Sequence, residues 1–274
     1  MMDIVDLHVH TTASDGTKTA EEVLSLASSC GLKAVAVTDH DTVSGIIDSH
    51  SSPVELIPGI EFSTKFITKV HILGYYIDID NAELKKQLKQ IIDDRDERNE
   101  KIVQAMRNDG IAVSYDEMKE RFGEIVGRPH FAEVIAENGL AMNVSDAFDK
   151  YLEKGRPYWF PRTTLSLERC IALITGAGGI AVIAHPFEYK YEKNSLDDLI
   201  RECMRFGVTG MECRHPSHTC GQMAYLERIC EDYGLLKTGG SDYHGDIKPE
   251  IRLGCGTGKV SVPYTWLEKI KESL

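Results

Sequence analysis

Residues 4–41 are IVDLHVHTTASDGTKTAEEVLSLASSCGLKAVAVTDHD, and they predict a strand, a helix and a second strand in succession. The apolar residues 4–7 predict the first strand. Residues 19–30 begin with a threonine suited to an N-cap and carry a glutamate three residues later, so they predict a helix. The continuous apolar run 34–37 predicts a fully buried strand. This order is typical of two parallel strands joined by a helix.

The same alternation returns along much of the chain. Further strands are predicted at 54–57, 70–76, 180–184, 209–213 and 236–238, and further helices at 165–175, 196–206 and 219–233. Repeated alternation of this kind predicts an α/β fold with a parallel sheet, either a barrel or a doubly wound sheet.

Residues 81–160 depart from the alternation because they carry only helical signals. The long charged segment 82–108 predicts one helix, and shorter helices should follow it. Their expected start and stop signals are Ser114 with Glu117, Pro129, Gly139 and Ser145. We therefore expect a barrel-type domain of residues 1–80 and 161–274, interrupted by a helical insertion subdomain of residues 81–160.

Composition narrows the class of protein. The 274 residues are 42% hydrophobic and carry a formal net charge of −12, which argues against a broad nucleic-acid-binding face. The seven cysteines are odd in number and form no C-x-x-C pair, a pattern typical of reduced thiols in a cytoplasmic protein. Neither a signal peptide nor a membrane-spanning segment is expected.

Histidine and acidic residues follow most of the predicted strands. His8 and His10 lie two residues apart on a strand and so face the same side. The other candidates are Asp15, His40, Glu61, His71, His185, Asp242 and His244. Ligands collect at the carboxyl ends of parallel strands, and imidazole with carboxylate suits Zn, Mn or Fe. The set exceeds the needs of one ion, so two or three divalent ions with a bridging carboxylate are expected.

A single histidine at a strand end is more often structural than a metal ligand, and His50 and His130 can each be explained in that way. The repetition of the same chemistry at many strand ends argues against that explanation for the whole set. Asp39 and Asp41 flank His40 and are expected to support ligands or cap a helix.

Five motifs together resemble the PHP family, named for polymerase and histidinol phosphatase. They are DLHVHT at 6–11, TDHD at 38–41, GIEFS at 59–63, AHP at 184–186 and SDYHG at 241–245. The resemblance implies a distorted (β/α)7 barrel, similar to a TIM barrel, with a trinuclear metal site. It assigns His8, His10, Glu61 and Asp242 to the first metal, Asp15, His40 and His244 to the second, and Glu61, His71 and His185 to the third. Some family members carry histidine where Asp15 stands.

Two segments of the insertion, GRPHFA at 127–132 and YLEKGRPYWFPR at 151–162, resemble one branch of this family. That branch contains nucleoside 3′,5′-bisphosphate phosphatases and a 5′-to-3′ exoribonuclease. The resemblance implies phosphate ester hydrolysis by metal-activated hydroxide, acting on a nucleotide or a short oligoribonucleotide. Phosphate is the expected product, and neither a membrane nor a stable protein partner is predicted.

Two further groups of residues are assigned to the chemistry. His215 or His218 is the candidate for phosphate contact or leaving-group protonation, although both could be surface groups after the strand that Pro216 ends. Arg128, His130, Lys154 and Arg156, joined by Arg162, are predicted to bind a second phosphate, with Tyr158 and Trp159 as candidates for stacking on a base. The alternative is solvated charges and core aromatics.

Three other functions remain open at this point. Histidinol-phosphate phosphatase is one, and the insertion counts against it. A metal-dependent amidohydrolase on a similar barrel is another, but these enzymes usually carry a lysine at a mid-chain strand end, where none stands here. A non-catalytic module of a DNA polymerase is the third, and no polymerase segment is present.

Overall fold

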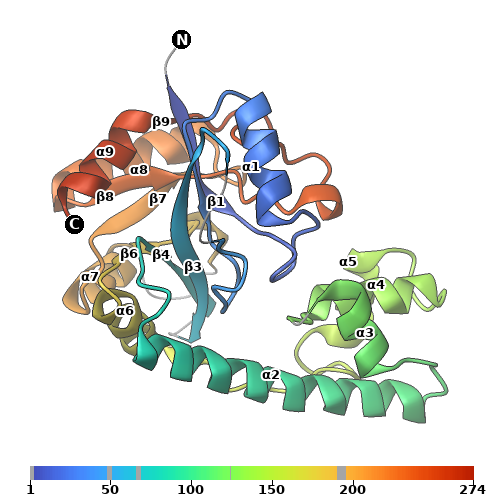
Figure 1. Cartoon of the computed structure of the whole chain (residues 1–274). Helices are drawn as coiled ribbons and strands as arrows, with labels where there is room; N and C mark the ends of the chain where they lie inside the picture. Colours follow the sequence, from blue (N-terminus) through green and yellow to red (C-terminus); the bar gives the residue numbers. More distant parts are fainter. Residues whose placement is uncertain (1–2, 48–50, 66–68, 124, 190–195) are drawn as a thin grey trace.

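The computed structural model describes residues 3–47, 51–65, 69–123, 125–189 and 196–274, so His50 lies outside the described residues. Its centre is a nine-stranded sheet in the order β8-β7-β6-β4-β3-β2-β1-β9, with β5 paired to β3 (Figure 1). The strands are β1 (Ile4–Val9), β2 (Ala34–Val37), β3 (Glu55–Lys65), β4 (Lys69–Tyr75), β5 (Leu165–Ser166), β6 (Ile180–Ile183), β7 (Gly210–Arg214), β8 (Leu236–Gly239) and β9 (Val262–Pro263).

The two ends of the seven-strand path from β8 to β1 meet. Val9 forms a parallel bridge with Tyr243, and the His10 amide donates to the Tyr243 carbonyl at 2.9 Å. Gly240 allows this approach, because a Cβ there would lie 2.4 Å from the His8 backbone nitrogen. The sheet is therefore a nearly closed barrel, as the sequence predicted.

The expectation of an all-parallel sheet is wrong at β4. This strand runs antiparallel to both β3 and β6, whereas β1–β2, β2–β3, β6–β7 and β7–β8 are parallel. Only residues 66–68 separate β3 from β4, and a parallel crossover needs a dozen or more. The short connection therefore dictates the reversal.

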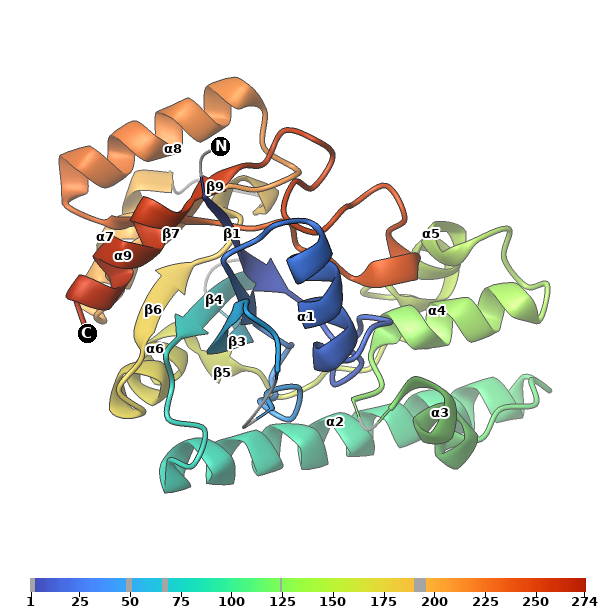
Figure 2. The same ribbon diagram turned by 45° about the horizontal axis from the view of Figure 1, so that its top comes forward.

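Helices cover the outside of the barrel (Figure 2). They are α1 (Ala20–Ser29), α6 (Leu167–Gly176), α7 (Leu196–Arg205), α8 (Cys220–Tyr233) and α9 (Tyr264–Glu272). The predicted capping box of α1 is present, with Thr19 accepting from the Glu22 amide. The helix expected from Leu165 instead begins after Ser166, which caps it.

A group of helices lies between β4 and β5 in the sequence. It comprises α2 (Ala82–Asn108), α3 (Tyr115–Phe122), α4 (Arg128–Glu137), α5 (Val144–Ala147) and the π-helical turn η1 (Phe148–Leu152). Helices α3, α4 and α5 gather over the far end of α2 (Figures 1 and 2), where Met106, Phe131 and Ile135 belong to a separate apolar core. We refer to α2 through η1 as the helical insertion, and its status as a subdomain of residues 81–160 stays a prediction.

Two predicted caps in the insertion are wrong in detail. Ser114 precedes α3 but its side chain makes no capping hydrogen bond. Asn143, and not Ser145, caps α5, because its side chain accepts from the Asp146 amide at 2.9 Å. Within the part of the chain that the structure describes, no helix is long and apolar enough to cross a membrane.

Candidate metal centre

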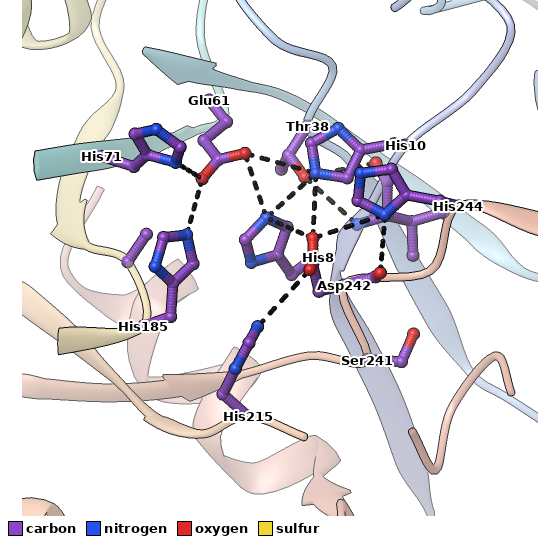
Figure 3. Close-up of polar contacts among 12 residues, drawn as sticks. His8, His10, Thr38, Glu61, His71, His185, His215, Ser241, Asp242 and His244 are labelled. Atoms are coloured by element: carbon purple, nitrogen blue, oxygen red, sulfur yellow. Dashed lines mark hydrogen bonds and ion pairs between the residues drawn. The ribbon is translucent and has the colours of Figure 1, made fainter. Parts of the chain in front are cut away.

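The barrel brings all nine predicted ligands to one end of the sheet. His8, Glu61 and His71 lie within strands β1, β3 and β4, and the others lie in the segments that follow β1, β2, β6 and β8. Their donor atoms form overlapping groups whose members lie within 4.8 Å of one another, and Figure 3 shows most of them in one cluster. The groups include His10–Asp15–His40–His244, His8–Glu61–His185, His8–His10–Asp242 and His40–Glu61–His71. We call these nine residues the candidate metal centre.

Glu61 lies in the middle of the candidate metal centre, and its two oxygens face different histidines (Figure 3). Oε1 lies 2.7 Å from His71 Nδ1 and 2.9 Å from His185 Nε2. Oε2 lies 3.0 Å from His40 Nδ1 and 3.3 Å from His10 Nε2. A carboxylate placed in this way can bridge two cations, one on each oxygen.

The Glu61 carboxylate is charged, and the imidazoles around it differ in protonation. Burial alone would raise the pKa of the Glu61 carboxyl, but the surrounding imidazoles, His40 first, hold that pKa well below its usual value. Burial lowers the pKa of His40 to about 3, so this imidazole is neutral at pH 7. Among the described residues, the buried Nδ1 atoms of His10, His40 and His185 have no hydrogen-bond partner. Although burial opposes it, hydrogen bonds to Asp242 and Glu61 raise the pKa of His10 to about 10, and the hydrogen bond to Glu61 raises the pKa of His185. A cation bound here would take the place of the protons on these two rings, and carboxylate with imidazole is a donor set that suits transition metals.

Backbone strain marks the same region. Asp41, His185 and Asp242 have φ angles of 57°, 23° and 51°, in the left-handed region that non-glycine residues rarely adopt. Two of the three are predicted ligands and the third follows His40. Strained backbone is retained where a site needs its geometry, so this clustering supports a functional role for the region.

Buried carboxylates that are not predicted ligands hold the centre in place. Glu212, which sequence reasoning missed, accepts from His8 Nδ1 at 3.0 Å through one oxygen and from the His185 amide at 2.8 Å through the other. Asp39 accepts from the Thr11 amide at 2.8 Å, in agreement with its expected supporting role. Glu212 fixes the His8 ring so that Nε2 faces the other ligands. The sequence feature that could have pointed to Glu212 is its acidic side chain within the otherwise buried strand GMECR.

The two candidate catalytic histidines lie in different surroundings. His215 Nε2 lies 3.7 Å from Asp242 Oδ2 (Figure 3), and its ring centroid is 5.2 Å from that of His185. His218 Nδ1 lies 3.2 Å from the Cys213 carbonyl, and its ring packs edge-on against Phe187. Both side chains are buried, so the surface-group alternative is wrong. Only His215 is directed at the candidate metal centre.

A cavity of about 670 Å³ opens beside the centre. Asp15 and His40 line it on the barrel side, and Arg128, Lys154 and Trp159 line it on the side of the insertion. A substrate in this cavity would touch both parts of the chain at once.

Two of the predicted substrate-binding residues do not line the cavity. His130 accepts from the Gly127 amide at 3.0 Å and stacks on Phe122 at 4.7 Å, so it is a buried cap of α4. Arg156 is exposed on a turn. Tyr158 is also unsuited to stacking on a base, because it is buried and its hydroxyl donates to Asp109 at 2.9 Å. The structure assigns these three residues to folding or to the surface.

Sequence reasoning missed two cavity residues, Arg95 and Arg98 of α2. Both are buried although α2 is strongly charged. Their spacing along the helix could have indicated burial, because both arginines continue a row of buried apolar positions. That row contains Leu84, Leu88, Ile91 and Ile102. We call Arg95, Arg98, Arg128 and Arg162 the arginine cluster.

Comparison with known proteins agrees with this architecture. The PHP domain family matches residues 6–207. The chain is 32% identical over 247 residues to the 3′,5′-nucleoside bisphosphate phosphatase of Chromobacterium violaceum, covering 88% of this chain and 87% of that protein. It is 32% identical over 259 residues to the 5′-3′ exoribonuclease Rnm of Escherichia coli K12, covering 92% of this chain and 88% of that protein. A structure assigned as a metal-dependent phosphoesterase from Bifidobacterium adolescentis has a TM-score of 0.85 at 28% identity, covering 98% of this chain and 95% of that one.

A nearly closed α/β barrel with histidine and carboxylate donors at its strand ends is typical of metal-dependent hydrolases. With the match over residues 6–207 and relatives that align along nearly its whole length, the chain belongs to the PHP family. This confirms the resemblance found in the sequence motifs.

Proposed function

We propose that this chain is a phosphoric ester hydrolase that cleaves a phosphate ester of a nucleotide, using two or three divalent ions of Mn, Zn or Fe. One observation carries the proposal: a cluster of nine donors around Glu61 opens into a cavity lined with arginines. The donors supply cation sites, and the arginines supply charge for an anionic substrate.

Different residues have different roles in the proposed hydrolysis. The nine candidate ligands would hold the ions, which would supply a nucleophile at neutral pH and neutralise charge on the phosphoryl oxygens. Glu212 orients His8. His215, whose Nε2 is buried and makes no hydrogen bond to any residue that the structure describes, is placed to contact the phosphate or to donate a proton to the leaving group.

The nucleotide character of the substrate rests on the insertion and the relatives. Arg128, Lys154 and Trp159 line the cavity, and they can contact a second phosphate and a base. The named relatives act on a nucleoside bisphosphate or on RNA. A nucleoside 3′,5′-bisphosphate and short RNA with a 5′ phosphate are therefore the two candidate substrates. All seven cysteines are free thiols, which fits the proposed cytoplasmic location.

The test compares substrates of both kinds. Protein loaded with Mn²⁺ is incubated with adenosine 3′,5′-bisphosphate, a 5′-phosphorylated trinucleotide and histidinol phosphate, and kcat/KM is measured for each. We expect hydrolysis of at least one nucleotide and its loss in Glu61→Gln. Preference for histidinol phosphate, or full activity of Glu61→Gln, would contradict the proposal.

A further inference from the structure

Asp242 presents its two carboxylate oxygens to different surroundings. Oδ1 lies 3.3 Å from His10 Nε2 and 3.5 Å from His8 Nε2, on the side of the other candidate ligands. Oδ2 lies 2.8 Å from Lys248 Nζ and 3.7 Å from His215 Nε2. Asp242 can therefore belong to a ligand group with the two histidines through one oxygen while it pairs with Lys248 through the other.

The backbone next to Lys248 is fixed by contacts with the loop that follows β1. Gly245 has a φ of 71°, and a Cβ at this position would overlap Thr17 Oγ1. The same hydroxyl accepts from the Asp246 amide at 2.9 Å. Only glycine permits this backbone conformation and this close approach without strain. The segment that follows β8 therefore places Lys248 beside Asp242 through its backbone as well as through the salt bridge.

The ammonium group of Lys248 can donate to a further acceptor. It carries three N–H donors, and Asp242 Oδ2 accepts from it at 2.8 Å. The Lys248 side chain is 38% exposed, whereas that of Asp242 is 17% exposed. Lys248 therefore lies at the outer edge of the candidate metal centre, where a bound substrate can reach its other donors.

The balance of charge at this edge favours an anion. The three carboxylates among the candidate ligands, Asp15, Glu61 and Asp242, do not balance the charge of two or three divalent ions. Lys248 adds another positive charge 2.8 Å from one of these carboxylates. A positive charge beside a cationic centre favours an anion that contacts both. A phosphoryl group supplies this charge, and its oxygens accept strong hydrogen bonds from ammonium groups.

Lys248 is separate from the arginine cluster. The cavity next to the insertion is lined by Asp15 and His40 on the barrel side, and its lining does not include Lys248, His215 or Asp242. The arginine cluster therefore faces the part of a substrate that extends toward the insertion. Lys248 and His215 instead face one oxygen of a candidate ligand.

We infer that Lys248 contacts the substrate directly, by donating to the phosphoryl group that is hydrolysed at the candidate metal centre. This inference rests on the proposed function and adds a residue to its site. Each candidate substrate presents a phosphoryl group to the same centre, so the contribution of Lys248 should not depend on the rest of the nucleotide. Inorganic phosphate should use the same contact.

Binding of inorganic phosphate to Mn²⁺-loaded protein tests the contact without catalysis. Isothermal titration calorimetry should give a Kd about 10- to 100-fold higher for Lys248→Met, because a charge-assisted hydrogen bond is lost. Lys248→Arg keeps the charge and should change Kd by less than about fivefold. Lys18→Met is the matched control, because it removes the same charge from a lysine that pairs with Asp246, which is not a candidate ligand, at 3.0 Å.

Elemental analysis separates a contact with phosphate from a role in metal binding. Lys248→Met should bind as many Mn²⁺ ions per chain as the original protein. If this variant loses an ion, Lys248 acts by positioning Asp242 and the inference is overturned.

Steady-state kinetics tests whether the contact is with the reacting group. For each nucleotide that the original chain hydrolyses, adenosine 3′,5′-bisphosphate or the 5′-phosphorylated trinucleotide, Lys248→Met should lower kcat/KM by the same factor. Unequal factors, no binding of phosphate by the original chain, or equal binding by Lys248→Met would overturn the inference. If neither nucleotide is hydrolysed but phosphate binding still depends on Lys248, the proposed function fails and the contact stands.

Discussion

At the scale of single residues, the chemistry of the centre depends on which imidazole nitrogen faces the ions. Glu212 decides this for His8 by accepting from Nδ1 at 3.0 Å, and it also holds the His185 amide. The convergence of the nine candidate ligands could be predicted from the sequence because each lies in or beside a strand of the barrel. Glu212 was missed because it lies inside strand β7 and belongs to none of the five motifs, so its contact with His8, 204 positions away, was seen only in the structure.

Glu212→Gln should weaken metal binding without unfolding the chain. The amide keeps the size of the carboxylate but loses the charge that orients His8, and losses of this kind lower metal affinity by about 10- to 100-fold. Competition with a fluorescent chelator measures the affinity. Glu227→Gln is the control, since Glu227 of α8 pairs with Arg214 of β7 and belongs to none of the candidate ligand groups. Equal affinity in the two variants would rule out the orienting role.

The two catalytic candidates should respond differently to truncation. His215→Ala should lower kcat by at least about 100-fold, because His215 faces Asp242 and a proton donor or phosphate contact contributes about that much. His218→Ala should change kcat less and should lower Tm, because its ring packs against Phe187. Steady-state kinetics with both variants checks this. Full activity of both would show that neither histidine takes part.

At the scale of elements, α2 joins the barrel to the insertion. Its buried row contains apolar residues at both ends and Arg95 and Arg98 in the middle, where the cavity lies. A periodic pattern predicted the helix correctly, but it did not predict that charged residues occupy the buried face. Strand β4 was likewise predicted as a strand, but its direction was not predicted. It runs antiparallel to β3 because the connection between the two strands is short.

Asp41→Asn should destabilise the contact between α2 and the barrel. Arg95 and Arg162 would then lack a charged partner, and the loss of one member of a buried pair costs about 3–5 kcal/mol. Urea unfolding of metal-free protein measures the change in the free energy of unfolding. Asp93→Asn is the control. Asp93 lies exposed on α2, and its substitution removes a surface pair with Lys89. A difference between the two below about 1 kcal/mol would contradict the structural role of Asp41.

At the scale of the whole molecule, an acidic chain holds a basic cavity. The net charge of −12 did not exclude an anionic substrate, because the insertion places arginines where the barrel ends its strands. The motifs predicted the barrel and the candidate metal centre because sheet topology brings strand ends together whatever their separation in sequence. They did not predict β9, which pairs with the N-terminal end of β1, or the helix α9 that follows it, because neither segment carries a motif.

We propose that imidazoles and carboxylates far apart in the sequence hold several cations around Glu61. Elemental analysis of purified protein, dialysed against Mn²⁺ and then against metal-free buffer, tests it most directly. We expect two or three ions per chain, with at least one lost in Glu61→Gln because a bridging carboxylate is removed. Fewer than one ion per chain, or an unchanged number in Glu61→Gln, would contradict it.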